Sequence, residues 1–472
     1  MPSLSDNKLW EQEQQFLKQE QQKSPELFVN EKKTPDQLLE RIGILSYPKD
    51  LPKGYIKYSP LDFIVEEIQT DGTVVTVDGD AAEHSPEGNA VIHADLIKLG
   101  ISTSDAVQRI SEALHLGPRQ IGYAGTKDAM ALTGQRISIQ GASPDAIGSL
   151  SLDQLFLKNL KGSNGSIQGG DLKGNRFTLF IRTEDRFDQE AFTKRVEKAG
   201  AEGIPNYVGS QRFGAPRFLA HAFGMHVLRG ETKAAVEKWL TKTSPFELPY
   251  FGRVREGWKT RFGNWEAMQA DIRELPHTFQ VESLLLEALK GQAGGNVFGK
   301  AVSALPQQIG TCLQAYGNYL VNAVLSEAEA AGRRLPETIP LLMSQNPEAK
   351  AFYALWLKQH GTENYLERMR EYGLGNALGK LSTIPSRIYP EMRGCQFLSE
   401  GVILSFDLPK WAPYATTVLM ALFDVTTEKP APDWVKTTEI DTKTVLQIGS
   451  LDGVRNRFQP VIQELLQRQE GE

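Results

Sequence analysis

Residues 122–139 read Gly122-Tyr-Ala-Gly-Thr-Lys-Asp-Ala-Met-Ala-Leu-Thr-Gly-Gln-Arg-Ile-Ser-Ile139, and the rest of the predicted fold is arranged around them. The apolar run that ends at Ala124 predicts a strand edge, and Gly125 predicts a turn. Polar and apolar residues alternate from Gln135 to Gln140, which predicts a second strand. Asp128 is therefore expected on a loop held by two strands. A lone Asp in such a loop usually only caps a turn, so its chemistry depends on the rest of the chain.

Two cations of this stretch bear on the ionisation of Asp128. Lys127 directly precedes it, and Arg136 lies within reach on the predicted second strand. Opposite charges favour the ionised form of a carboxylate. An ionised carboxylate can act as a nucleophile or base without a metal, so Asp128 is a candidate catalytic residue.

Length and composition describe a soluble protein of more than one domain. The 472 residues exceed one ordinary core, so two domains are expected, or three if the ends fold separately. Hydrophobic residues make up 40% and charged residues 23% of the chain, as in ordinary globular enzymes. No apolar run approaches a membrane span, and the N-terminus has no basic segment followed by an apolar core. We therefore expect a cytoplasmic protein without a membrane partner.

Cysteine usage and net charge restrict the possible ligands. Cys312 and Cys395 lie far apart without metal-type spacing, so neither a disulfide nor a zinc site is predicted. His221 and His226 are five residues apart and would not share a helix face as zinc ligands require. The net charge is −6, so a nucleic acid could be bound only by a local basic face.

Hydrophobic periodicity predicts an α/β or α+β first half. Residues 7–22 predict a solvated helix rather than a partner-docking arm. A helix begins at Ser102 or Thr103 and is closed by Gly117 and Pro118. Further predicted elements are strands at 55–68 and 73–77 around an Asp71-Gly72 turn, a strand at 91–99, a strand pair at 154–157 and 173–182, and a helix at 189–198.

Two further segments carry side chains suited to binding. Lys173-Gly-Asn-Arg-Phe177 offers an amide at Asn175 and, on the same side of a strand, the flat ring of Phe177, although Phe177 alone is better explained as core. Pro205-Asn-Tyr-Val-Gly-Ser-Gln-Arg-Phe-Gly-Ala-Pro-Arg-Phe218 interleaves arginines with aromatic rings, which suits RNA. A salt-bridged corner between domains is the alternative for this second segment, and the two explanations are compatible.

Several motifs in this order resemble the TruD-type tRNA pseudouridine synthase family. They are Gly125-Thr-Lys-Asp128, Lys173-Gly-Asn-Arg-Phe177 and Asn206-Tyr-Val-Gly-Ser-Gln-Arg-Phe-Gly214. Asp62-Phe-Ile-Val-Glu-Glu67 is similar to the family's opening signature, Ala315-Tyr-Gly-Asn-Tyr-Leu-Val-Asn322 resembles its later helix, and Leu408-Pro-Lys-Trp-Ala-Pro-Tyr-Ala-Thr416 resembles its closing segment. The likeness covers most of the chain, from about Lys57 to Leu422. Val208, Gly317 and Asn318 depart from the family pattern, which bears on RNA contacts more than on chemistry.

The resemblance implies an α+β fold with a pseudouridine-synthase catalytic domain of mixed sheet, interrupted by an inserted, mainly helical α/β domain (the TRUD domain), with RNA in the cleft between them. The expected boundaries are a charged helical extension at 1–45, the catalytic domain at 46–208 and 380–423, the inserted domain at 209–379, and a C-terminal extension at 424–472. Helices at 233–240, 281–289 and 313–328 would dominate the insertion, and a strand at 402–406 would complete the sheet.

The resemblance also implies a function and its residues. The chain would isomerise a specific uridine, by family uridine 13 of tRNA, to pseudouridine, using no metal or cofactor. Asp128 would be the nucleophile, or else a proton acceptor at the sugar, and Lys57 would pair with it. Asn175 and Phe177 would receive the flipped base, a base that must leave its helical stack. Tyr207, Arg212 and Arg217 would bind RNA, and Glu67 matches the family without an assigned step.

Other functions have less support in the sequence. A non-catalytic RNA-binding or RNA-folding protein on the same scaffold is the main alternative, and the presence of Asp128 argues against it. A glycosidase would need a second acid opposite Asp128. Glu66 and Glu67 are the candidates for that acid, but no spacing in the sequence places either of them there. Gly294-Gly-Asn-Val-Phe-Gly-Lys300 imitates a phosphate-binding loop, but Ala301 replaces the metal-binding Ser or Thr and a helical run precedes it. A monomer is the simplest assembly, and another RNA could replace tRNA.

Overall fold

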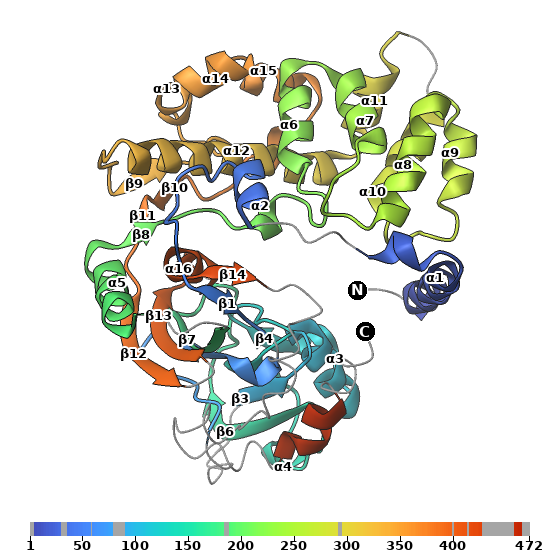
Figure 1. The fold of residues 1–472 in the computed structure, drawn as a ribbon. Coiled ribbons are helices and arrows are strands. Elements are labelled where there is room, and N and C mark those ends of the chain that lie inside the picture. Colours follow the sequence, from blue (N-terminus) through green and yellow to red (C-terminus); the bar gives the residue numbers. More distant parts are fainter. Residues whose placement is uncertain are drawn as a thin grey trace. The chain divides into compact units, whose positions relative to one another are not determined.

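The computed structural model describes residues 4–29, 35–57, 59–78, 90–183, 188–290, 295–398, 401–412, 415–426 and 457–464. The chain divides into two compact units (Figure 1). The sheet unit comprises residues 48–204 and 387–472, and the helical unit comprises residues 1–47 and 205–386. The sheet unit is therefore assembled from two stretches that are separated in sequence by most of the helical unit.

One mixed sheet of ten strands forms the sheet unit. Its main path runs β12-β13-β7-β2-β5-β3-β6, with β1 beside β7 and β14, and β4 beside β5. The pairs β2–β5 and β1–β14 are parallel, and the others are antiparallel. The strands are β1 (Lys53–Tyr55), β2 (Phe63–Ile68), β3 (Val91–Leu99), β4 (Ile121–Tyr123), β5 (Leu132–Gln140), β6 (Leu155–Ser163), β7 (Gly174–Thr183), β12 (Glu391–Leu398), β13 (Gly401–Pro409) and β14 (Asp424–Thr426). Mixed sheet and helices together confirm the expected α+β class.

The predicted strands pair differently from the sequence expectation. The segments at 154–157 and 173–182 are strands but not partners, because β6 pairs with β3 while β7 lies between β13 and β2. Residues 73–77 form no strand, only a bridge between Val74 and Ile68. Both edges of β2 are already occupied by β5 and β7, so no hairpin partner is available there. The Asp71-Gly72 turn is present, with Gly72 at φ +88.

Helices cover both faces of this sheet, and alternation along β7 decides what each side chain meets. Phe177, Leu179 and Ile181 pack in one cluster with side chains of α5 (Gln189–Glu202) and α16 (Ala415–Leu422). Phe180 faces the other way and joins Phe458 of the helix at 457–464. A third cluster packs beneath α3 (Thr103–Ala113) and α4 (Pro144–Gly148). Part of the C-terminal extension thus belongs to the core.

The helix after Ser102 begins as predicted and ends earlier. Ser102 Oγ accepts from the Asp105 N–H at 3.0 Å, as an N-cap does. The helix stops at Ala113 with Leu114 as its C-cap, and a separate 3-10 turn follows at Pro118–Gln120. Gly117 and Pro118 therefore belong to the next turn rather than to the helix end.

Helices dominate the helical unit. They are α1 (Leu4–Lys23), α2 (Pro35–Arg41), α6 (Ala220–Arg229), α7 (Thr232–Thr241), α8 (Pro249–Arg261), α9 (Trp265–Asp271), α10 (Gln280–Lys290), α11 (Val297–Ser303), α12 (Pro306–Ala330), α13 (Ala349–Phe352), α14 (Ala354–His360) and α15 (Tyr365–Glu371), beside the small pair β9 (Thr338–Pro340) and β10 (Thr383–Pro385). The apolar helix α12 packs closely on α6, where a Cβ on Gly224 would lie 2.3 Å from the Cys312 carbonyl oxygen. Only glycine fits this crossing.

The N-terminal helix is docked, although the sequence predicted a solvated one. Glu13 is buried, and its carboxylate accepts the main-chain N–H groups of His277 at 2.6 Å and Thr278 at 3.0 Å, just before α10. The rings of Phe28 and Tyr250 stack 5.0 Å apart. The thin apolar stripe predicted only solvation, because a buried carboxylate that caps another segment leaves no periodic signal. Among the described helices, none is long and apolar enough to cross a membrane.

Candidate active site

Asp128 lies in the sheet unit on the loop between β4 and β5, as its motif predicted. Its Oδ1 accepts the Met130 N–H at 3.0 Å, which orients the carboxylate. Its Oδ2 accepts a hydrogen bond from Lys57 Nζ. The exposed fractions are 31% for the Asp128 side chain and 22% for that of Lys57. The carboxylate is thus half-buried, oriented and paired with one cation, while part of it still faces solvent.

Lys57 holds an unusual main-chain conformation to reach this position. Its φ is +57, a left-handed value that costs a non-glycine residue free energy and persists where the surroundings enforce it. Its ammonium lies 4.2 Å from the centre of the Phe63 ring, a cation–π contact. Lys57 therefore points inward between a ring and a carboxylate.

The two cations that the sequence placed around Asp128 have other partners. Lys127 Nζ donates to Glu67 Oε2 at 2.5 Å, inside the protein. Arg136 Nε donates to Asp95 Oδ1 at 2.8 Å across the β3–β5 pair. The expectation that Lys127 crowds Asp128 is wrong, because adjacent residues of an extended loop direct their side chains apart and Glu67 attracts Lys127 into the interior.

Three buried side chains, for which the sequence predicted no role at the site, hold the main chain of this loop. Lys98 Nζ donates to the Asp128 carbonyl at 2.9 Å. Thr103 Oγ1 accepts the Lys127 N–H at 2.9 Å. Gln135 Nε2 donates to the Gly125 carbonyl at 3.1 Å. Lys98 had one detectable signal, since it is a charged residue near the end of the apolar strand Val91–Leu99.

The carboxylates of β2 are not placed as a second catalytic acid. Glu67 is bound to Lys127, and it also accepts the Arg136 N–H at 3.2 Å. Glu66 Oε1 accepts the Val77 N–H at 2.8 Å. Both are thus engaged within the fold, which removes the candidates named for a two-carboxylate glycosidase.

Asn175 and Phe177 lie on one face of β7, as alternation predicted. Asn175 is buried beside Glu67 in the strand register, and its Oδ1 has no hydrogen-bond partner among the described residues. Phe177 is 3% exposed and stacks on Phe406 with ring centres 5.6 Å apart. It also makes an edge contact at 6.2 Å with Phe63, the ring beneath Lys57. Asn175 therefore offers an unfilled acceptor, whereas Phe177 is a core residue.

The residues predicted to bind RNA lie in the helical unit and differ in accessibility. Tyr207 is buried and its hydroxyl donates to the Ser46 carbonyl at 2.5 Å. Arg212 is exposed at the end of a 3-10 turn. Arg217 is buried and pairs with Glu282 at 3.2 Å, and burial lowers its pKa to about 10. The structure thus gives Arg217 the salt-bridged role that the sequence had left open beside RNA binding.

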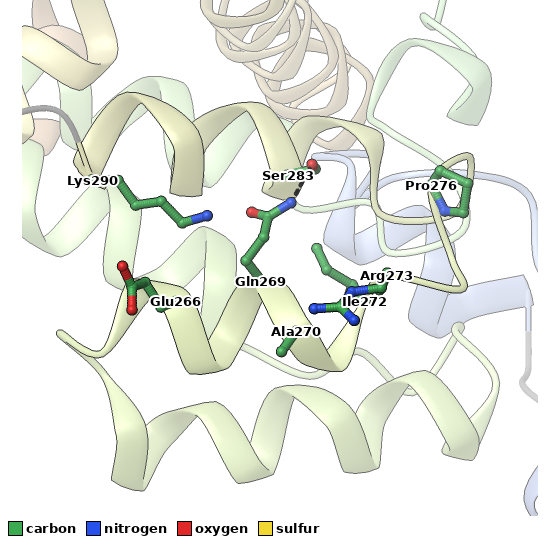
Figure 2. Close-up of a pocket in the computed structure, with 8 residues that line it drawn as sticks. All are labelled: Glu266, Gln269, Ala270, Ile272, Arg273, Pro276, Ser283 and Lys290. Atoms are coloured by element: carbon green, nitrogen blue, oxygen red, sulfur yellow. Dashed lines mark hydrogen bonds between the residues drawn. The ribbon is translucent and has the colours of Figure 1, made fainter.

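A separate cavity of about 490 Å³ lies between α9 and α10 (Figure 2). Gln269 Nε2 donates to Ser283 Oγ at 2.8 Å there. The lining residues are Glu266, Gln269, Ala270, Ile272, Arg273, Pro276, Ser283 and Lys290. All belong to the helical unit, so this cavity is distinct from the Asp128 loop. In the described part of the chain, no group of three His, Cys, Asp or Glu side chains is placed to hold a metal ion.

Known proteins share the fold of this chain and the sequence around its Asp128 loop. The family model described as "tRNA pseudouridine synthase D (TruD)" matches residues 41–351. A solved structure from Methanosarcina mazei, which carries a provisional tRNA pseudouridine synthase D (TruD) name, superposes with a TM-score of 0.63 at 21% identity, covering 84% of this chain and 99% of that one. The family model therefore gives the class of protein as that of the pseudouridine synthases, and the solved structure agrees with this chain in fold.

Sequence relatives narrow this class to a family. "Probable tRNA pseudouridine synthase D" of Archaeoglobus fulgidus is 33% identical, over 61% of this chain and 66% of the relative. The Methanopyrus kandleri protein of the same name is 32% identical over 69% and 84%. "tRNA pseudouridine synthase D" of Geobacter sp. is 26% identical over 78% and 95%. The chain belongs to the TruD family.

Proposed function

We propose that this protein is an RNA pseudouridine synthase, an isomerase that acts on one uridine of tRNA, with Asp128 as its catalytic residue. The observation that carries the proposal is the Asp128 carboxylate itself, oriented by the Met130 N–H and paired with Lys57 in a half-buried position. Membership of the TruD family and the names of the relatives supply the reaction and the tRNA substrate. By family, the target is uridine 13.

The reaction rearranges bonds without redox change or net hydrolysis. The N1–C1′ bond of uridine breaks, the uracil turns while bound, and C5 bonds to C1′. C5 then loses a proton and N1 gains one, so the product is an isomer of the substrate. Asp128 acts at the sugar as nucleophile or as proton acceptor, and Lys57 donates a hydrogen bond to its carboxylate.

Binding of the target base requires acceptors and a pocket in the sheet unit. A uridine must leave its stack, at a cost of a few kcal/mol that contacts in the pocket recover. The buried Oδ1 of Asn175 suits a uracil N–H, because no described residue donates a hydrogen bond to it. Phe177 supports this face of the sheet from the core, through Phe406 and Phe63. Stacking of the base on Phe177 rests on the family resemblance alone, because the ring is 3% exposed and contacts Phe406 and Phe63 in the core.

The test is conversion of uridine to pseudouridine in unmodified tRNA by the purified protein, with a chelator present. Asp128→Asn removes the charge with little change of shape, and Asp71→Asn is the matched control, because Asp71 is an exposed turn carboxylate that accepts the Thr73 N–H at 2.8 Å. We expect the wild type and Asp71→Asn to convert one uridine, and Asp128→Asn to bind tRNA without converting it. Full conversion by Asp128→Asn would refute the catalytic assignment. Binding without conversion by the wild type would favour the non-catalytic RNA-binding protein.

A further inference from the structure

The loop that carries Asp128 is fixed from inside the sheet unit by a buried lysine. Lys98, on β3, has no exposed surface. Its ammonium donates to the carbonyl of Asp128 at 2.9 Å and to the carbonyl of Ile101 at 2.8 Å. Ile101 directly precedes the N-cap of α3. One side chain therefore ties the loop at Asp128 to the start of a helix.

We propose that Lys98 is a positioning residue for Asp128: its buried ammonium fixes the main chain of the catalytic residue and sets the direction of the carboxylate. This inference rests on the proposed function of Asp128. Lys98 touches no reacting atom, because both contacts go to main-chain carbonyls.

The division of contacts along the loop explains why Lys98 matters for orientation. Gln135 and Thr103 hold the loop before Asp128, at the Gly125 carbonyl and the Lys127 N–H. Thr103 Oγ1 also donates to Gln135 Oε1 at 2.9 Å, so these two groups support each other. Lys98 acts on Asp128 itself. Because catalysis depends on the placement of reacting groups to within about 1 Å, a loop released at this residue keeps its fold and loses reactivity.

The charge of Lys98 contributes as well as its hydrogen bonds. Burial lowers the pKa of its ammonium to about 8, opposed by Asp128 and Asp105 and assisted by Lys127. These three charged groups come from the loop and from α3. As pH rises through about 8, Lys98 loses its charge, and with it the strength of both hydrogen bonds. Wild-type turnover should therefore fall across this range.

The experiment compares Lys98→Met with Lys158→Met in single-turnover conversion of tRNA. Lys158 is a second buried lysine, on the neighbouring strand β6, and its ammonium donates to the Asp78 carbonyl. We expect Lys98→Met to lower the rate of the chemical step by about 10- to 100-fold, with tRNA affinity within about 2-fold of wild type. Lys158→Met should retain wild-type turnover.

A pH profile separates positioning from a merely structural role. Wild type and Lys158→Met should lose turnover as pH rises past about 8, and Lys98→Met should lack this step. The RNA titrates equally in all three reactions, so it cancels in the comparison. Full activity in folded Lys98→Met, or the same alkaline step in that variant, would overturn the proposal.

Two further outcomes test the role of Lys98: a Lys98→Met variant that does not fold, and the activity of Asp128→Asn. If Lys98→Met does not fold, the test is the pH profile of wild-type turnover. A wild-type turnover rate that stays constant up to about pH 9 overturns the inference. Activity in Asp128→Asn would remove the proposed function, and the inference with it. An inactive Asp128→Asn beside a fully active Lys98→Met would remove only the inference.

Discussion

Lys127 Nζ lies 2.5 Å from Glu67 Oε2, and the exposed fractions of the two side chains are 4% and 0%. The cation adjacent to Asp128 in sequence thus neutralises a different, fully buried carboxylate. Asp128 is left to Lys57, which comes from a segment 71 positions earlier. Lys127 and Asp128 are consecutive residues, but Lys127 belongs to the buried ion pair with Glu67, and Asp128 belongs to the half-buried pair with Lys57.

Removing one partner of the internal pair should destabilise the fold. Glu67→Gln leaves the Lys127 ammonium buried without a counter-charge, and we expect the free energy of unfolding to fall by about 3–5 kcal/mol in urea titrations. The double variant with Lys127→Met removes the orphaned charge and should recover most of that loss. Equal losses in the single and double variants would contradict an ion pair that is neutralised internally.

Lys57 should matter for the rate more than for binding. Lys57→Met removes the cation that pairs with Asp128, so kcat should fall about 10- to 100-fold while the tRNA dissociation constant changes little. Lys53→Met, at an exposed lysine on the preceding strand, is the matched control. Lys57→Gly should lose the same activity and be more stable than Lys57→Met by about 1 kcal/mol, because glycine accepts φ +57 without strain. Turnover that survives in both Lys57 variants would count against the pair.

Lys98 should make stability depend on pH in a defined direction. Its folded pKa of about 8 lies below the ordinary value of 10.5, so the unfolded chain binds more protons between these values. The free energy of unfolding should therefore rise with pH across this interval, by about 3 kcal/mol at most. This added stability is lost as pH falls back through about 8. Subtracting the profile of Lys98→Met isolates this contribution. A difference profile that is flat from about pH 8 to 10.5 would mean that burial does not lower the pKa of Lys98, which would then stay charged in the folded state across this interval.

Arg212 and Arg217 should respond oppositely, although both were predicted to bind RNA. Arg212→Ala, at an exposed position, should weaken tRNA binding and reduce the slope of log affinity against log salt by about 1, with unchanged stability. Arg217→Met leaves Glu282 without one of its buried cations and should cost about 3–5 kcal/mol of stability, as seen in urea unfolding. Circular dichroism melts run beside binding isotherms separate the two effects. An Arg217→Met variant with wild-type stability and weakened tRNA binding would show that Arg217 binds RNA and does not stabilise the fold.

Local signals in the chain predicted most of the elements near the site. Alternation predicted β3 and β5, the N-cap Ser102 predicted the start of α3, and Gly125 predicted the turn before Asp128. These features depend on residues a few positions apart, so they are visible without tertiary structure. The predicted hairpin at 73–77 was wrong because it depended on a free edge of β2, a property of the whole sheet.

The amino-acid order alone was thus sufficient to indicate an α+β protein of the TruD family and to single out Asp128, Lys57 and Asn175. Tertiary structure was needed to show which charges pair. Glu67 lies 60 positions from Lys127 and Lys98 lies 30 positions from Asp128, and no periodicity relates such positions. The pairing of a buried charge is set by strand order and burial, because desolvation forces each buried ion to find a partner wherever the fold brings one within reach.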